Sequence, residues 1–351
     1  MNPSSILSFN YLLRFSLMAI VCMGIIFTLV DYWSPASRMD FLYHKKMRLF
    51  AQQKDELEAI VLGTSHSKGF HFPSLGILGM NFFDGGGDID EAEFKFNVIA
   101  AQARKLSIVF IPISPGSLQF SRRWIIEDES QRQYIVMKNT PISLWQYPAL
   151  WGSMVTDYIG FFRLRVKLLD RIRSKLESLT GADYGQGISN LCYSKDSISE
   201  HLKLEDGIVG GYKRQLIKPA CINQYADETV KSHMEHIRRS LSSESGIAER
   251  HLKALLSMAK TLEQRQGRLV LVIPPLTREY YQDPRIQALL PEHFALLSRL
   301  AAHPNIEVYD FHDFFYEQMA DGSNDYFYDD DHLALPGAIE FSKALRETMG
   351  L

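Results

Sequence analysis

The chain has 351 residues, of which 46% are hydrophobic and 23% are charged, and its formal net charge is −3. These values are ordinary for a globular protein that is long enough to bury a sizeable core. The charge balance provides no basic field that would attract nucleic acid, so we expect no nucleic-acid partner.

The first predicted element is an uncharged apolar segment from Phe15 to Val30. With the apolar residues just before it, it reaches the lower limit for a membrane-spanning helix, about 17 residues, and interfacial aromatic residues follow at Tyr32 and Trp33. We therefore interpret residues 1–33 as a membrane anchor and 34–57 as a charged juxtamembrane connector that is helical at its end. A cleaved signal peptide is the main alternative, although no Ala-x-Ala site follows, and a buried core helix is the weaker one.

Downstream of the connector, apolar runs alternate with segments of helical periodicity. The predicted strands are 58–63, 79–83, 107–113, 268–273 and 306–310. The third should end at Pro112, because proline interrupts a central strand. The predicted helices cover about 88–104, 229–264 with a break near Ser245-Gly246, 285–302 and 336–348. This alternation predicts an α/β fold with a mainly parallel sheet.

One segment, from about 117 to 227, breaks the alternation. It is rich in Trp, Tyr and Arg and lies between the third and fourth predicted strands. We interpret it as a large insertion in a domain that spans residues 58–351, placed where it can cover or shape a site. Cys192 and Cys221 both lie in it and could pair in an oxidising compartment.

The first chemically informative block is Gly63-Thr64-Ser65, which follows a buried strand. A serine at that point is exposed at the carboxyl edge of the sheet, where open α/β sheets bind ligands. Ser65 is therefore the candidate nucleophile, and it needs a base to remove its proton. Alternatively, Ser65 only caps the next helix. Ser67 is a competing serine, and His66 is expected to be a flanking side chain because adjacent residues rarely face each other.

The second block, Asp329-x-x-His332, lies near the end of the chain. His332 is the candidate base, and Asp329 is the carboxylate expected to orient its imidazole, since residues three apart share a face when a segment makes a helical turn. Asp330 and Asp331 are alternatives to Asp329. The run of three carboxylates could instead bind a cation, or it could be an acidic surface turn.

A glycine-rich turn after the second predicted strand, residues 81–87, is the candidate oxyanion hole. Backbone N–H groups must come within about 3 Å of a developing oxyanion, and glycine permits that approach. We assign Gly86 and the N–H of Ser65 as the donors; a flexible turn is the alternative. A phosphate-binding loop is disfavoured by the lack of Gly-Lys-Ser/Thr. The Cys and His spacings indicate no metal site, and we expect no cofactor.

These features resemble the SGNH (GDSL-like) hydrolase superfamily. The resemblance is carried by the N-terminal apolar segment, the block from Gly63 to Ser67, and Asp329-x-x-His332-Leu333. It covers about residues 55–350 and is greatest with membrane-anchored members that act in D-alanyl transfer to lipoteichoic acid or in polysaccharide O-acetylation. It implies a flavodoxin-like three-layer α/β/α fold and a Ser-His-Asp triad without metal. It also implies an extracytoplasmic position, often beside a membrane-bound O-acyltransferase.

The chain departs from the superfamily pattern at two points. The usual Gly-Asp-Ser is Gly-Thr-Ser here, and the usual Gly-x-Asn-Asp block after the third strand is replaced by Ile113-Ser114-Pro115-Gly116. Ser114 is the polar residue nearest the position of the missing asparagine, so the third oxyanion donor of the family is not assigned. The anchored acylation proteins also tend to lack this asparagine, which favours them over free esterases.

The sequence therefore predicts a serine-dependent acyl- or acetyltransferase, or an esterase, that acts on an envelope glycan outside the cytoplasm. The inner membrane holds it through a single N-terminal helix, and its partners are the glycan or acylated polymer and a membrane-bound O-acyltransferase. The alternative is a catalytically inactive protein, anchored in the membrane, that binds a glycan or a partner. Aromatic residues of the insertion would suit sugar stacking: Trp124, Trp145, Tyr147 and Trp151. A divalent-cation phosphohydrolase using the three aspartates is a weaker third hypothesis.

Overall fold

The structure, a computed structural model, describes residues 46–83, 86–124 and 216–351, with short stretches between 136 and 152 and a few residues between 11 and 22. The chain divides into two units, Met1–His44 with Trp145–Gln186, and Lys45–Leu144 with Gly187–Leu351. In the first unit, the described residues include helical residues at 13–18 and the 3₁₀ helix η5 (Pro148–Leu150). The candidate site lies entirely in the second unit.

The second unit is built on a five-stranded parallel sheet. Its strands are β1 (Ala59–Val61), β2 (Gly79–Asn81), β3 (Ile108–Pro112), β4 (Arg268–Ile273) and β5 (Ile306–Asp310). The order is β2-β1-β3-β4-β5 and every pair is parallel. This is a common order of doubly wound folds, with the topological switch between β1 and β3. The predicted α/β class and parallel sheet are confirmed, and β3 ends at Pro112 as predicted.

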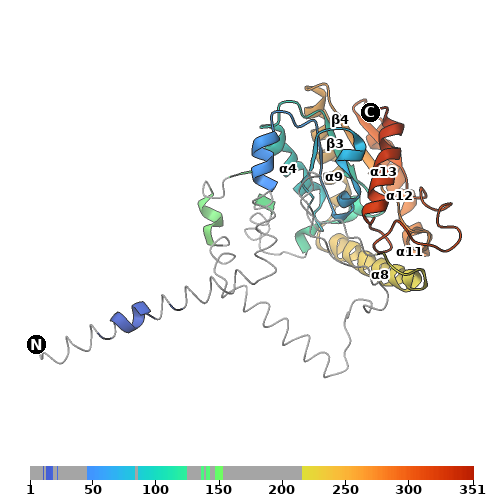
Figure 1. The fold of residues 1–351 in the computed structure, drawn as a ribbon, viewed down its shortest axis with the longest axis horizontal. Helices are drawn as coiled ribbons and strands as arrows, with labels where there is room; N and C mark the ends of the chain where they lie inside the picture. The colour runs from blue at the N-terminus through green and yellow to red at the C-terminus, as the bar shows by residue number, and fades with distance from the viewer. Residues whose placement is uncertain are drawn as a thin grey trace, which may run out of the picture. The chain divides into compact units, whose positions relative to one another are not determined.

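Helices cover both faces of the sheet, as expected of a three-layer α/β/α arrangement. One face is covered by α4 (Ile89–Ala100), α9 (Ile247–Glu263) and α12 (Leu290–Ala301), and the other by α3 (Phe72–Leu75) and α13 (Leu335–Met349). Figure 1 shows β3 and β4 between α4 and α13.

Alternate strand residues supply the two hydrophobic cores. Ile60, Val109 and Leu271 belong to the core beneath α4, α9 and α12. Their neighbours Val61 and Phe110 belong to the core beneath α3 and α13. Because the strands are apolar on both faces, they read as continuous hydrophobic runs in the sequence. Burying each such side chain contributes about 1.5–3 kcal/mol, so both helical layers stabilise the sheet.

A third group of helices lies beside the sheet. It comprises α8 (Pro219–Ser243), α10 (Arg278–Tyr281) and α11 (Pro284–Gln287), joined through a smaller apolar cluster around Val230 and Tyr280. The predicted helix at 229–264 is thus two helices, α8 and α9, which separate before Gly246. Gly246 has a left-handed backbone (φ 74°), a conformation that favours glycine.

Two predicted boundaries differ from the structure. The last part of the predicted insertion, 117–227, is helical, because α8 begins at Pro219. The predicted connector, 34–57, ends within the domain, because residues 46–53 are helical and Phe50 and Leu57 are buried in the sheet core. The charged residues of this helix made it resemble a linker, whereas its apolar side chains pack inward.

The predicted anchor falls largely outside the described residues. Of Phe15–Val30 the structure describes only 15–18 and 22. Among the helices that the structure describes, none is long and apolar enough to span a bilayer. Cys22 is a free thiol, whereas Cys221 in α8 is disulfide-bonded; Cys192, its predicted partner, lies outside the described residues.

Candidate active site

The end of β1 delivers Ser65 to the carboxyl edge of the sheet. Gly63 has φ 105°, a conformation that L side chains rarely adopt, and it turns the chain out of the strand. Ser65 is then the first residue of the 3₁₀ helix η1 (Ser65–Gly69). The Oγ of Ser67 donates to the carbonyl of Leu62 at 2.9 Å, and the Nδ2 of Asn81 donates to the carbonyl of Ser67 at 2.7 Å. These bonds fix the turn and occupy the hydroxyl of Ser67, the competing serine.

A closed loop near the C-terminus delivers His332. An isolated antiparallel bridge joins Phe327 to Leu333, and the backbone N–H of Tyr328 donates to the carbonyl of His332 at 2.9 Å. Inside this loop, Asp329 Oδ1 accepts the backbone N–H of His332 at 2.7 Å. The loop itself therefore holds the Asp329 carboxylate next to the imidazole of His332, and α13 begins directly afterwards.

The two ends of the chain meet as a Ser-His-Asp arrangement. His332 Nε2 lies 2.6 Å from Ser65 Oγ. On the other side of the ring, His332 Nδ1 lies 2.9 Å from Asp329 Oδ1 and 3.1 Å from Asp329 Oδ2. The three residues predicted as nucleophile, base and orienting carboxylate are thus brought together, with the hydrogen-bond geometry that an activated serine requires.

A second carboxylate reaches the same imidazole nitrogen. Asp331 Oδ1 lies 2.6 Å from His332 Nδ1, and its side chain is only 2% exposed. Burial alone would lower the pKa of His332, but Asp329 and Asp331 together raise it well above the ordinary value. Burial raises the pKa of Asp331, but the imidazoles of His332 and His66 outweigh this effect and hold it well below its ordinary value.

The middle carboxylate of the acidic run has a different environment. Asp330 is fully buried, and its Oδ1 accepts a hydrogen bond from the hydroxyl of Thr229 at 2.9 Å. Burial and the charges of Asp331 and Asp329 raise the pKa of Asp330 to about 8. Asp330 therefore holds the loop against α8, while its two neighbours contact the imidazole.

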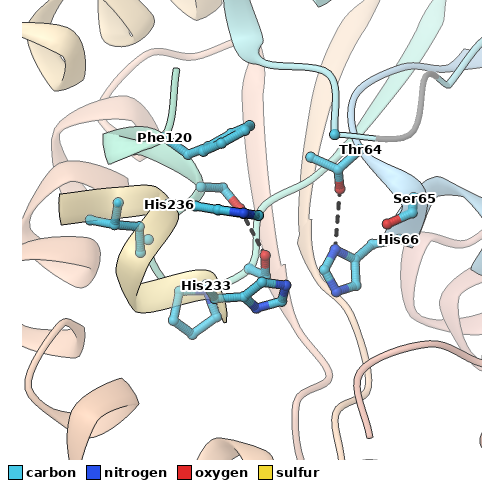
Figure 2. A pocket seen from close by; sticks show the side chains of 12 residues that line it. Thr64, Ser65, His66, Phe120, His233 and His236 are labelled. Atoms are coloured by element: carbon cyan, nitrogen blue, oxygen red, sulfur yellow. Dashed lines mark hydrogen bonds between the residues drawn. The ribbon is translucent and has the colours of Figure 1, made fainter. Parts of the chain in front are cut away.

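An open pocket of about 550 Å³, part of it open to solvent, adjoins the nucleophile. One wall is the end of β1, with Ser65 and His66, and the opposite wall is α8. Figure 2 shows His233 and His236 of α8 facing His66 and Ser65 across the pocket, with Phe120 beside His236.

The pocket also contains Gly86, assigned with Ser65 to the oxyanion hole, and Ser114, the polar residue nearest the position of the missing asparagine. Gly86 lines it with a left-handed backbone (φ 69°), and a side chain at that position would meet open space. Its assignment as a donor remains a prediction, because neighbouring residues of the glycine turn lie outside the described ranges. Ser114 lines the pocket as well, with its Oγ 2.8 Å from the Oγ of Ser117.

Three pocket histidines were missed or misjudged in the sequence. His66 is not a mere flanking residue, because its ring stacks on that of His332 with centroids 4.9 Å apart and an interplanar angle of 10°. His233 and His236 lie on α8, beyond the segment interpreted as an insertion. Their spacing along one helix was the only available signal, and nothing in it indicated which part of the sheet they would face.

Another histidine with a carboxylate partner lies outside the pocket. His312 Nδ1 lies 2.8 Å from Asp310 Oδ1, at the end of β5, and its ring stacks on Tyr281 with centroids 3.9 Å apart. Asp310 also accepts the backbone N–H of His312 at 3.1 Å, so the pair is a local feature of the turn after the strand.

In comparisons with known proteins, the chain matches no family model, no curated protein and no solved structure. The chemistry of the site therefore has to be argued from its geometry. A hydroxyl, an imidazole and two carboxylates in this order can transfer a proton away from the hydroxyl and stabilise the resulting imidazolium.

Proposed function

We propose that this protein is a serine-dependent acyl-transfer enzyme of the SGNH type, an O-acyltransferase or esterase that acts on a glycan of the cell envelope. The observation that carries the proposal is the 2.6 Å separation of Ser65 Oγ and His332 Nε2, two residues that are distant in sequence. An inactive binding protein has no need of this geometry, which favours the enzyme over that alternative.

In the proposed mechanism, Ser65 Oγ attacks the carbonyl carbon of an acyl ester while His332 Nε2 takes its proton. Asp329 and Asp331 hold the Nδ1 side of the imidazolium. The N–H groups of Ser65 and Gly86 stabilise the oxyanion. His332 then returns the proton to the departing alcohol, and an acyl-serine remains. A sugar hydroxyl or water, deprotonated by the same imidazole, takes the acyl group and restores the serine.

The surroundings of the site support this assignment. The pocket opens at the carboxyl ends of β1 and β3, the topological switch point at which doubly wound sheets bind ligands. Its α8 wall carries Ile237, which with Phe120 offers an apolar surface for a short acyl chain. A disulfide at Cys221 is typical of oxidising compartments and supports an extracytoplasmic position.

Covalent labelling with a fluorophosphonate tests the proposal. We expect the wild-type protein to be labelled at Ser65, identified by peptide mapping, and to hydrolyse p-nitrophenyl acetate. Ser65→Ala should lose both properties, and His332→Ala should lose most of the labelling rate, because the members of such a triad act as a unit. Ser298→Ala, which removes an exposed serine on α12, is the matched control. Labelling of Ser65→Ala at the wild-type rate would rule out the nucleophile.

A further inference from the structure

Three imidazoles converge on one buried carboxylate beside the pocket. Asp331 uses Oδ1 for His332, as described above. Its other oxygen, Oδ2, lies 3.2 Å from His66 Nε2 and 3.8 Å from His233 Nε2. These residues come from three separate parts of the chain, η1, α8 and the loop before α13, so no short sequence motif marks the cluster.

Two atoms of this cluster lack a hydrogen-bond partner within the described part of the chain. His66 Nε2 and Asp331 Oδ2 are both shielded from solvent and lie 3.2 Å apart as an ion pair, but their relative orientation does not form a hydrogen bond. The residues themselves are only 8% and 2% exposed. Leaving a buried polar atom unsatisfied costs about 1–3 kcal/mol, and native proteins usually satisfy such atoms with protein, water or an ion.

The two histidines outside the Ser-His-Asp arrangement are oriented in the same way. His66 Nδ1 lies 3.1 Å from the hydroxyl of Thr64, and His233 Nδ1 lies 2.8 Å from the hydroxyl of Tyr280. When each Nδ1–H donates to its hydroxyl, each Nε2 presents a lone pair toward Asp331. Metal-binding histidines are held in this way, with one ring nitrogen on the metal and the other bonded to a neighbouring group.

We propose that His66 Nε2, His233 Nε2 and Asp331 Oδ2 form a binding site for a divalent cation of the zinc class. At metal–ligand distances of about 2.0–2.2 Å, the ligand atoms of a tetrahedral site lie roughly 3.3–3.5 Å apart. The two separations measured from the carboxylate, Asp331 Oδ2 to His66 Nε2 at 3.2 Å and Asp331 Oδ2 to His233 Nε2 at 3.8 Å, are close to this value. Two imidazoles with one carboxylate suit zinc, whereas magnesium and calcium prefer sites made of oxygen.

The pocket provides a route by which an ion could reach the cluster. His66 and His233 both line the pocket, and the side chain of His233 is 34% exposed, so it is free to move toward the carboxylate. With three protein ligands, a fourth coordination position would remain for water or a substrate oxygen. The ion would thus lie next to the Ser65–His332 pair without displacing it.

His332 is not needed as a ligand. It lies close enough to His66 and Asp331 to join a metal-binding group. Its Nε2, however, faces Ser65 and its Nδ1 faces Asp329, so both of its ring nitrogens are engaged. The proposed site therefore leaves the Ser-His-Asp arrangement intact, and the site goes beyond the proposed function rather than depending on it.

A second group with metal-binding proximity, Asp88, Asp90 and His251, is a weaker candidate. Both oxygens of Asp88 already accept backbone N–H groups, from Glu91 and from Arg122. Asp90 accepts a hydrogen bond from the guanidinium of Arg250 at 2.7 Å. A cation there would compete with positive charges already in place, whereas the described contacts of Asp331 Oδ2 are two imidazoles.

Zinc binding by the full chain, prepared without a histidine tag, tests the proposal directly. Equilibrium dialysis should show one tight equivalent of zinc, and cobalt substituted at the site should give the intense visible absorption of tetrahedral coordination. His233→Ala should weaken zinc binding by at least 10- to 100-fold, the loss typical of disturbed metal sites. His236→Ala is the matched control, because His236 lines the same pocket on the same helix but packs its ring against Phe120.

The outcomes separate this site from the proposed function. Ser65→Ala should bind zinc like the wild type even though it is inactive, so failure of the nucleophile assignment would leave this result unaffected. Thermal unfolding measured alongside will show that His233→Ala is folded, and His66→Ala provides a second ligand variant. An unchanged zinc affinity in both ligand variants, or no stoichiometric zinc in the wild type, would overturn the proposal.

Discussion

Because Asp329 and Asp331 both contact His332 Nδ1, we predict that neither carboxylate alone is indispensable for catalysis. We consider Asp329→Asn, Asp331→Asn and the double variant. Asparagine keeps an oxygen that can accept the backbone N–H groups of Asp331 and His332, which Asp329 Oδ1 accepts at 3.2 and 2.7 Å. The loop should therefore keep its shape in Asp329→Asn, and the change removes mainly a negative charge beside Nδ1.

The magnitude follows from the contacts that survive. A hydrogen bond to a charged group is worth about 1.5–3 kcal/mol, and each 1.36 kcal/mol is a factor of ten. Each single variant retains one carboxylate near Nδ1, at 2.6 Å for Asp331 or 2.9 Å for Asp329. We therefore expect each single change to lower kcat about 10- to 150-fold. The double variant should approach the roughly 10⁴-fold loss seen when a triad with one carboxylate is changed to the amide.

The assay is p-nitrophenyl acetate turnover together with the rate of fluorophosphonate labelling, both with a chelator present so that a bound cation does not contribute. Asp330→Asn is the matched control, because its carboxylate contacts Thr229 rather than the imidazole. A loss of about 10⁴-fold in Asp329→Asn alone would show that Asp331 does not support the imidazole. A double variant no worse than the single variants would refute the idea that the two carboxylates share one role.

Three further predictions concern pH and the backbone. Because the pKa of His332 is raised well above 6.5 and only the neutral imidazole accepts the serine proton, kcat/KM should rise with pH to a midpoint above 6.5, and Asp331→Asn should lower that midpoint. The pKa of Asp330 is about 8 in the folded protein, above the ordinary value of 3.8, so the free energy of unfolding of the wild type should fall as pH rises from about 3.8 to about 8. Asp330→Asn lacks this ionisation. The difference in melting temperature, variant minus wild type, should therefore increase across this range and stay constant above it. Gly63→Ala should lower the free energy of unfolding by about 1–3 kcal/mol and slow Ser65 labelling, because φ 105° is strained for alanine; unchanged urea unfolding would contradict this.

Much of the sheet could be predicted because each strand is buried on both faces. β4 and β5 coincide with the predicted runs, Arg268–Ile273 and Ile306–Asp310, since an uninterrupted apolar run between polar turns has few other solutions. The helix break before Gly246 was likewise evident from glycine chemistry. The connector was wrong at its end, because charge in the sequence does not reveal that one face of the short helix at 46–53 packs on the sheet.

The pairing of Ser65 with His332 was predicted from the residue types of the two motifs and from the family resemblance, because only Ser65 follows directly on a strand end. Asp329 was predicted as the orienting carboxylate, but the contact of Asp331 with the same nitrogen was not, since it depends on the loop that the bridge between Phe327 and Leu333 closes. The approach of His233 depends on how α8 packs against α10 and α11, which is a property of tertiary structure alone. Oxyanion donation by Gly86 and the membrane anchor stay predictions.

The helix that forms one wall of the pocket also touches the acidic loop at two places. Thr229 of α8 bonds to Asp330, and four residues along the same helix His233 approaches Asp331. One helical turn of α8, about 5.4 Å, therefore spans both contacts. A shift of α8 along its axis would break the Thr229–Asp330 and His233–Asp331 contacts together. The same movement would therefore change the shape of the pocket and the position of the loop that carries His332.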